Sequence, residues 1–510
     1  MLAKTSMKPT IRFGDAMLKG EEFFAQTMRS ASALGAAGVI QGDLFALLLL
    51  NEPAYLELMM AARWIGARWV PVNWHFKADE VRSILTASGV KLLIAHSDLI
   101  DAVRDAIPAG VRIFTIEPGP YTRKVCALPE AHSAIVVSDE RWELWRDQTE
   151  RPRVQQSAPG SAVFFTSGTT GPSKGVILRP PTPAQVETLM ANAKIAYGIE
   201  PGARVLLSAP LYHSGPSHYA TMAALMSCEI VIEPRFDAET TLRRIDTLQL
   251  SHAYLVPTMY VRLLRLPAEV KARYDLGSMR FVASTGAPCP PDVKQEMINW
   301  WGPVIHESYG SSEMGLMTHI DSTDSLRKRG SAGKAVPGVT LRVAAEDGSA
   351  CAPGEIGTVY VRTEVTPAFT YLNNAEARRA AEREGTVTLG DLGYLDDEGF
   401  LFLVDRRVDV VNSGGTKIYT PEVESVLIQM PEVADCAVYG VPDEEFGEAL
   451  VAAVQTRAGA VLTAAQVRDH VRQHLAGFKV PRYVEFHARL PRDDTGKMFK
   501  RHLRGIRNSH

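Results

Sequence analysis

The stretch that decides the fold of this chain is Thr166-Ser167-Gly168-Thr169-Thr170-Gly171-Pro172-Ser173-Lys174-Gly175. It lies between two apolar runs, 162–165 and 176–178, which we expect to form strands. Glycines let backbone N–H groups approach oxygen atoms closely, hydroxyls donate hydrogen bonds, and Lys174 adds a positive charge. The stretch therefore suits a polyanion, although the same residue types also build ordinary surface hairpins.

The spacing of this stretch excludes a Walker A phosphate loop. That motif reads G-x-x-x-x-G-K-[ST], and counting from Gly168 its second glycine position is occupied by Ser173. Lys174 is followed by Gly175 instead of the Ser or Thr that would hold magnesium. If the stretch binds phosphate, it is a phosphate loop of another kind.

Length and composition fit a soluble protein of several domains. The 510 residues exceed one ordinary core, and 46% hydrophobic with 22% charged residues is typical of globular proteins. The formal net charge of -3 gives no reason to expect nucleic acid or a membrane surface as a partner. The longest apolar run, 44–50, is too short to span a bilayer, so we expect no integral membrane association.

Cysteine usage and the N-terminus indicate a cytoplasmic protein. The cysteines are odd in number and widely spaced, and they form no CxxC pair, which argues against a disulfide framework or a zinc site. Residues 1–21 lack the apolar core of a signal peptide. The sequence leaves open whether the protein forms a homodimer. The cysteines are Cys126, Cys228, Cys289, Cys351 and Cys436.

From residue 44 onward, short apolar runs alternate with longer amphipathic segments. This strand–helix–strand rhythm implies parallel strands with right-handed crossovers, so the predicted fold class is α/β, with a large N-terminal domain of mainly parallel-sheet subdomains. The expected strands are 44–50, 69–72, 90–95, 205–208, 230–233 and 281–284, and the expected helices are 54–66, 78–88, 217–226 and a segment that ends at residue 300.

After about residue 330 the expected strands, 339–344, 357–362 and 401–404, indicate a more antiparallel and β-barrel-like subdomain. The last part, 407–510, alternates helix-like and strand-like segments and has the length of a small α+β domain. We place the domains at 1–405 and 406–510, with the boundary in the charged run 405–409.

Two further stretches follow strands and carry polar side chains. Residues 211–216 contain His213 and should face a pocket, because ligands in open α/β sheets bind at the carboxyl ends of strands. Residues 307–313 are expected to form a loop, with Tyr309 to stack a purine and Glu313 to coordinate magnesium. A structural histidine and a solvated turn are the alternatives that the residues themselves leave open.

Near the C-terminus the chain carries three more candidates. Asp391, between two glycines, could accept hydrogen bonds from two adjacent hydroxyls, and Arg406 could add a planar cationic fork. Lys497 lies in a turn close to the chain end, where a lysine is usually an ordinary surface charge.

In this order and at this spacing, these stretches resemble the adenylate-forming superfamily of acyl-CoA synthetases, luciferases and nonribosomal adenylation domains. The stretch 166–175 is similar to the family's phosphate loop, 309–313 to its YGxTE motif, and Lys497 lies in a match to PxxxxGKxxR. Residues 71–75 resemble stand-alone acyl-CoA synthetases. The resemblance covers nearly the whole chain and implies ATP, Mg2+ and coenzyme A as cofactor and co-substrates.

The resemblance also implies roles for individual residues. Lys497, His213 and Glu313 would be catalytic, with Glu313 the metal ligand. The ATP- and AMP-binding positions would be Thr166, Ser167, Gly168, Thr169, Thr170, Gly171, Lys174, Gly286, Ala287, Pro288, Glu307, Ser308, Tyr309, Gly310, Ser311, Ser312, Asp391 and Arg406. The acyl pocket would contain Tyr212, His213, Gly215, Tyr219, Val256, Pro257, Met259, Ser284 and Leu316. The coenzyme A path would run along Ser413, Gly414, Gly415 and Lys417, and the hinge would be Arg407 and Val408.

Three positions depart from the family pattern. Ser312 replaces the usual Thr but keeps its hydroxyl. Leu389 separates Thr388 from Gly390-Asp391, which makes a ligand role for Thr388 doubtful. Val408 stands where an Asp or Lys hinge is usual, so Arg407 is the alternative pivot.

The implied reaction has two steps. A carboxylate attacks the α-phosphate of ATP to give an acyl-adenylate and pyrophosphate, and the thiol of coenzyme A then displaces AMP after the small, mobile C-terminal domain rotates. The predicted pocket is mostly apolar, which favours a fatty, alicyclic or aromatic monocarboxylic acid. The alternatives are an aryl-CoA ligase, a stand-alone enzyme that loads a carrier protein, and a non-catalytic nucleotide or acyl-ligand sensor.

Overall fold

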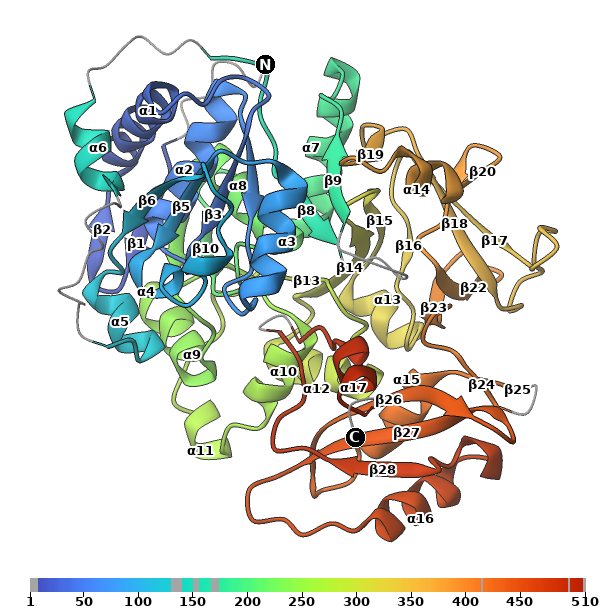
Figure 1. The fold of residues 1–510 in the computed structure, drawn as a ribbon. Coiled ribbons are helices and arrows are strands. Elements are labelled where there is room, and N and C mark those ends of the chain that lie inside the picture. The colour runs from blue at the N-terminus through green and yellow to red at the C-terminus, as the bar shows by residue number, and fades with distance from the viewer. Residues whose placement is uncertain are drawn as a thin grey trace.

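The computed structural model describes residues 8–129, 140–149, 156–166, 174–413, 416–493 and 496–507. Figure 1 shows sheets and helices of a large N-terminal part and a smaller C-terminal unit, drawn in orange and red, packed against it. The predicted α/β class with a small α+β unit at the C-terminus is confirmed.

A five-stranded sheet is parallel throughout, as the local rhythm predicts. Its order is β4 (Arg68–Pro71), β3 (Leu44–Leu48), β5 (Leu92–His96), β6 (Arg112–Ile116) and β7 (Glu140–Arg141). The helices before, between and after these strands are α1 (Gly20–Ala36), α2 (Pro53–Ile65), α3 (Ala78–Ser88), α4 (Ser97–Ile100), α5 (Pro120–Cys126) and α6 (Trp142–Gln148).

A nine-stranded sheet forms the second layer, parallel from β1 to β14 and antiparallel at both edges. The carboxyl ends of its central strands therefore meet at one edge, where loops can converge on a ligand. Its order is β16 (Lys334–Ala335), β15 (Gly315–Ile320), β14 (Ile305–Ser311), β13 (Phe281–Ser284), β12 (His252–Tyr254), β10 (Arg204–Leu207), β11 (Glu229–Ile232), β1 (Thr10–Phe13) and β2 (Ala16–Leu18).

The main hydrophobic core joins the two sheets through α2 and α8 (Ser214–Leu225). Phe45 of β3, Leu58 of α2, Ala220 of α8 and Leu206 of β10 are all fully buried in it. This burial fixes the start of α8, which carries His213 at its N-cap. The other helices here are α7 (Pro183–Tyr197), α9 (Ala238–Leu248), α10 (Pro257–Leu264), α11 (Ala268–Lys271), α12 (Pro291–Trp301) and α13 (Ser322–Arg327).

Two antiparallel sheets complete the N-terminal part. In the first, β8 (Phe164–Thr166) and β9 (Lys174–Leu178) pair across the decisive stretch, with β19 (Phe369–Tyr371) beside β9. The flanking strands are thus confirmed, and residues 167–173 lie outside the described part of the chain. The second contains β17 (Val339–Ala344), β18 (Gly357–Thr363), β20 (Glu382–Arg383), β21 (Thr386–Val387), β22 (Asp391–Leu395) and β23 (Leu401–Arg406), and α14 (Ala375–Ala380) lies beside it.

The C-terminal unit has a sheet and a hydrophobic core of its own. A short turn at 407–409 joins it to the end of β23. Its elements are β24 (Val411–Ser413), β25 (Thr416–Ile418), α15 (Thr420–Leu427), β26 (Val433–Asp443), β27 (Gly447–Thr456), α16 (Ala464–His474), β28 (Tyr483–Phe486) and α17 (Lys500–Arg507). Over the described ranges of the whole chain, none of the helices combines the length and apolar character that a membrane crossing needs.

Two local expectations were wrong. Residues 307–311 are not a loop, because β14 continues to Ser311 and pairs with β15, so only a tight turn at Ser312–Met314 remains. Helix α8 begins at Ser214 and not at residue 217, which places Ser214, Gly215 and Pro216 in its first turn.

Candidate active site

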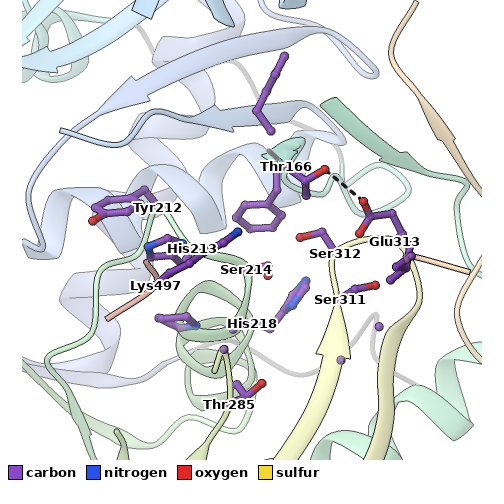
Figure 2. Close-up of a pocket in the computed structure, with 18 of the residues that line it drawn as sticks. Thr166, Tyr212, His213, Ser214, His218, Thr285, Ser311, Ser312, Glu313 and Lys497 are labelled. Carbon is purple, nitrogen blue, oxygen red and sulfur yellow. Dashed lines mark hydrogen bonds between the residues drawn. The ribbon is translucent and has the colours of Figure 1, made fainter. Parts of the chain in front are cut away.

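A cavity of about 590 Å3 opens at the carboxyl edge of the nine-stranded sheet. Its wall is built from the loop after β10, the first turn of α8, the ends of β13 and β14, the β8–β9 hairpin and a loop of the C-terminal unit. Figure 2 shows Lys497 reaching into this cavity from the side of His213, with Thr166 and Glu313 across from it. Residues far apart in the sequence thus meet in one place.

The carboxylate of Asp493 positions the loop that carries Lys497 into the cavity. The backbone N–H of Lys497 donates to Asp493 Oδ1 at 2.9 Å, and Asp493 Oδ2 lies 3.1 Å from His213 Nε2. Asp493 is only 7% exposed, although it lies in a loop of the C-terminal unit. The loop therefore docks against His213 of the N-terminal part.

The neighbouring glycine completes this docking. Gly496 has φ +79, and a Cβ on it would meet Thr258 Cγ2 of α10 at 2.1 Å. Only glycine fits both this left-handed backbone and this close approach.

On the opposite wall, Glu313 is held by two hydroxyls. Thr166 Oγ1 donates to Glu313 Oε1 at 3.1 Å and Tyr371 OH donates to the same oxygen at 3.3 Å. Burial, and then the negative charge of Glu313, raises the pKa of Tyr371 well above its usual range. Lys174 lies over the Tyr371 ring, 5.3 Å from its centroid, so the lysine near the end of the 166–175 stretch reaches the same wall.

The β14 strand places its polar side chains on two sides. Ser308, Gly310, Ser311 and Ser312 line the cavity. Glu307 instead points into the protein, where its carboxylate pairs with Lys294 Nζ at 2.6 Å. The latter contact ties β14 to α12 and gives Glu307 a structural partner.

Tyr309, Asp391 and Arg406 form a second polar group. Tyr309 OH donates to Asp391 Oδ2, and Arg406 Nε lies 3.3 Å from Asp391 Oδ1. Burial, and then the Asp391 charge, raises the pKa of Tyr309, so its phenol stays protonated. Arg406 and Gly390 line the cavity, and so does Thr388, whose hydroxyl accepts from Gly390 N at 3.1 Å.

The residues predicted for the acyl pocket fall into two groups, those that line the cavity and those that are buried in the core. Tyr212, His213, Gly215, Val256 and Leu316 line the cavity. The remaining candidates, Tyr219, Pro257, Met259 and Ser284, are buried without lining it. Tyr219 lies between Tyr197 and Tyr254, with ring centroids 5.7 and 5.5 Å away, on the core side of α8.

Several predicted residues lie elsewhere. Gly286 lines the cavity, whereas Ala287 and Pro288 follow it beyond the wall. Ser413 and Lys417 lie in the β24–β25 hairpin, which Figure 1 shows on the far side of the C-terminal unit from α10. Lys417 Nζ pairs there with Glu346 at 2.8 Å. The remaining predicted positions, Ser167, Gly168, Thr169, Thr170, Gly171, Gly414 and Gly415, are outside the described residues.

The predicted hinge lies at the junction of the two units. Arg407 N donates to Gly390 O at 2.8 Å, and Val408 is 39% exposed. The next residue, Asp409, pairs with Arg504 of α17 at 3.1 Å. The turn is thus tied to both sides, with Val408 itself facing solvent.

The structure also adds residues that the sequence reading did not select. Asp493, His218, Thr285 and Tyr371 all line or complete the cavity. Asp493 lies shortly before the predicted catalytic Lys497, and this proximity in the sequence was the one signal that could have identified it. His218 lies in the segment 217–226, which was predicted only as an ordinary helix, and the segment around Tyr371 carried no prediction.

Comparison with known proteins agrees with this geometry. Residues 2–370 match the model of the AMP-binding enzyme family, and residues 422–497 match its C-terminal domain. The indoleacetate–CoA ligase of Aromatoleum aromaticum is 31% identical over 98% of this chain and 95% of its own. The long-chain-fatty-acid–CoA ligase FadD13 of Mycobacterium tuberculosis is also 31% identical, over 96% and 93%.

A solved structure shares the whole architecture. It is the o-succinylbenzoate CoA synthetase of Bacillus subtilis in complex with its acyl-adenylate intermediate, with a TM-score of 0.80, 27% identity and coverage of 98% of this chain and 96% of that chain. The chain therefore belongs to the AMP-binding enzyme family, as an acyl-CoA synthetase of the adenylate-forming superfamily.

Proposed function

We propose that this ligase activates an apolar monocarboxylic acid, whether fatty, alicyclic or aromatic, and that Lys497 serves only the first of its two steps. The observation that carries the proposal is the entry of Lys497 into the cavity beside His213 and opposite Glu313. The acid and ATP are both anions, so a cation between them is needed to bring the carboxylate to the α-phosphate. Lys497 would bridge them.

Glu313 is the residue proposed to hold Mg2+. Its two hydroxyl donors both reach Oε1, and within the described part of the chain Oε2 has no donor. One carboxylate suffices, because Mg2+ in nucleotide sites takes its other ligands from phosphates and water. The described residues contain no group of three metal-ligating side chains, which agrees with a metal that arrives with ATP. Bound there, the ion would neutralise phosphate charge.

The acid class is inferred from the cavity wall. Phe164, Ile84, Val256 and Leu316 give it apolar surface, and Tyr212 adds an aromatic face. The basic side chains that line it, Lys174, Arg406 and Lys497, all belong to the proposed nucleotide side. By their names, the two ligases compared by sequence act on indoleacetate and long-chain fatty acids, which are monocarboxylic acids with apolar bodies.

The second step is proposed to use the β24–β25 hairpin. Ser413 and Lys417 now lie away from the cavity, and a rotation of the C-terminal unit at Arg407 and Val408 would exchange this hairpin for the Lys497 loop. The exposed Val408 makes no polar contact with the described part of the chain that a rotation would break, and Arg407 is held through its backbone to Gly390. The domain limits of 1–405 and 406–510 and a cytoplasmic location stay predictions, and whether the protein forms a homodimer stays open.

The proposal is tested by separating the two half-reactions. Acyl-adenylate is trapped with hydroxylamine across a panel of fatty, alicyclic and aromatic acids, with and without coenzyme A. In Lys497→Ala, ATP-dependent hydroxamate should fall at least 100-fold, while thioester formation from preformed acyl-adenylate should continue. Lys417→Ala is the matched control on the other face of the unit, and it should impair only the second step.

Each outcome of this experiment is informative. Equal loss of both half-reactions in Lys497→Ala would overturn the domain rotation. Hydroxamate formation without any coenzyme A thioester would instead favour an enzyme that loads a carrier protein. No hydroxamate from any acid would favour the nucleotide or acyl-ligand sensor.

A further inference from the structure

His218 projects into the acyl side of the cavity. It lies one turn after Ser214 on α8, so the two side chains share a face of the helix, and both line the cavity. Its ring packs edge-on against Phe164, with centroids 5.9 Å apart. His218 has an exposed surface although protein surrounds it, which places that surface in the cavity.

No protein group satisfies the ring nitrogens of His218 within the ranges that the structure describes. The other buried imidazoles of the N-terminal part do have such partners, as His252 has in Ser251 and Gly198. A polar group enclosed by protein costs free energy when its hydrogen bonds are unmade. The cavity occupant is the remaining source of a partner.

Electrostatics decides which partner His218 can take. Burial, and then the positive charge of Arg63, lowers the pKa of His218 to about 4, so the ring is neutral near pH 7 and carries one N–H donor. Arg63 of α2 donates only a long bond of 3.5 Å, to Gly160 O, and it has no carboxylate partner among the described residues. Its field disfavours a cationic substituent and favours an electron-rich atom beside His218.

We propose that His218 forms a polar subsite of the acyl pocket, and that the preferred acid carries a hydrogen-bond-accepting oxygen, a hydroxyl or a carbonyl, on its otherwise apolar body. In Figure 2, His218 and Thr285 lie in the lower part of the view, whereas Thr166 and Glu313 of the nucleotide side lie above them. A second carboxylate is not the expected group, because Arg63 does not line the cavity and the basic residues that do are on the nucleotide side. The inference rests on the proposed acyl-adenylate chemistry and narrows its substrate class.

The test compares pairs of acids that differ by one oxygen. Suitable pairs are cinnamic and para-hydroxycinnamic acid, phenylacetic and para-hydroxyphenylacetic acid, and a medium-chain fatty acid with and without a keto group. The readout is kcat/KM for ATP-dependent hydroxamate. In the unmodified enzyme the oxygenated member of at least one pair should be preferred about tenfold, the size of one added hydrogen bond.

Two variants assign the preference to His218. His218→Leu removes the donor at similar volume, so it should abolish the preference by slowing the oxygenated acid while sparing its partner. His218→Asn keeps an N–H donor and should retain part of the preference. Thr221→Val is the matched control, because Thr221 lies on the same helix, bonds among the described residues only to Ser217 O at 2.8 Å, and does not line the cavity.

The outcomes separate the two proposals. Product from both members of every pair at equal efficiency, or an equal loss for both in His218→Leu with an unchanged melting temperature, would overturn the polar subsite alone. Product from no acid at all would overturn the proposed function, and the subsite with it.

Discussion

His213 Nε2 lies 3.1 Å from Asp493 Oδ2, and the other oxygen of the same carboxylate accepts the backbone N–H of Lys497. His213 caps α8 in the N-terminal part, whereas Asp493 and Lys497 belong to the C-terminal unit. Because one buried carboxylate contacts both residues, the position of Lys497 and the orientation of His213 are coupled. The contact exists only while the lysine loop is docked.

Asp493 should therefore matter for adenylation and not for thioester formation. Asp493→Asn keeps an oxygen for the Lys497 N–H but loses the charge that faces His213, and we expect adenylation to fall about tenfold, the scale of one charge-assisted hydrogen bond. Asp493→Ala loses both contacts and should cost more. The measurement is pyrophosphate release, compared with thioester formation from preformed acyl-adenylate.

A double-mutant cycle with His213→Gln is the control for this coupling. If Asp493 acts through His213, the Asp493→Asn change should add little in the His213→Gln background. Fully additive losses, or an equal decline of both half-reactions, would show that Asp493 merely stabilises the loop.

Gly496→Ala provides a second test of loop docking. Its Cβ would meet Thr258 Cγ2 at 2.1 Å, and φ +79 is strained for any L residue, so the docked state should be disfavoured. We expect slower adenylation with normal thioester formation. Thr258→Ala should relieve the steric part of the defect and leave the backbone part, whereas no rescue at all would argue that Gly496 does not approach α10 in solution.

Local periodicity explains why much of the fold was predictable. Strands of a parallel sheet are buried on both faces, so their sequences are short apolar runs. The runs 44–50 and 205–208 were predicted as buried strands for this reason, and β3 and β10 lie there in the structure. The hydroxyl-rich stretch around Tyr309 read as a loop, since its antiparallel partner β15 could not be seen from local sequence. Tertiary pairing overrode its local propensity there.

Helical phase explains the errors in the acyl pocket. With α8 starting at Ser214, residues Ser214 and His218 share the face toward the cavity, whereas Tyr219 is rotated into the core. The predicted helix began at residue 217 and left Ser214 out, so nothing in the sequence gave a reason to place Ser214 and His218 on one face. Asp493 was missed for a different reason, because a carboxylate in a terminal turn reads as solvated until its docking partner is known.

Gly215→Ala should disturb the cavity through Tyr254. A Cβ on Gly215 would lie 2.1 Å from the phenol oxygen of Tyr254, which is itself buried and lines the cavity. Displacing that ring should lower the free energy of unfolding by about 1–3 kcal/mol, as overpacking does, and should reduce kcat/KM for bulky acids. Chemical denaturation and the hydroxamate assay measure the two effects.

Two variants control for the Gly215 prediction. Gly35→Ala in α1 meets no atom within 4 Å, so it should be neutral or stabilising. Tyr254→Phe removes the oxygen that the new methyl group would meet, and the double variant should recover part of the stability. An equal loss with and without the Tyr254 hydroxyl would locate the strain elsewhere.

A ladder of stacked rings across β13, β14 and β15 should make stability depend on pH. His306 stacks on Phe281 with centroids 3.8 Å apart, and its Nδ1 lies 3.3 Å from Nε2 of His319. Burial lowers the pKa of both histidines to about 4, and for His306 the His319 charge contributes too, while nearby Asp321 opposes the shift in both. Unfolded histidines titrate near 6.5, so between about pH 6.5 and pH 4 the unfolded chain binds more protons.

The free energy of unfolding should therefore fall as the pH falls through that window, by about 2–3 kcal/mol for the pair once their partial exposure is discounted. His306→Phe keeps a ring on Phe281 and removes one of the two titrating groups, so it should roughly halve this loss. Urea unfolding at a series of pH values measures the slope. Because His218 titrates in the same window, the comparison is made in the His218→Leu background, where an unchanged slope in His306→Phe would mean that the ladder does not control acid stability.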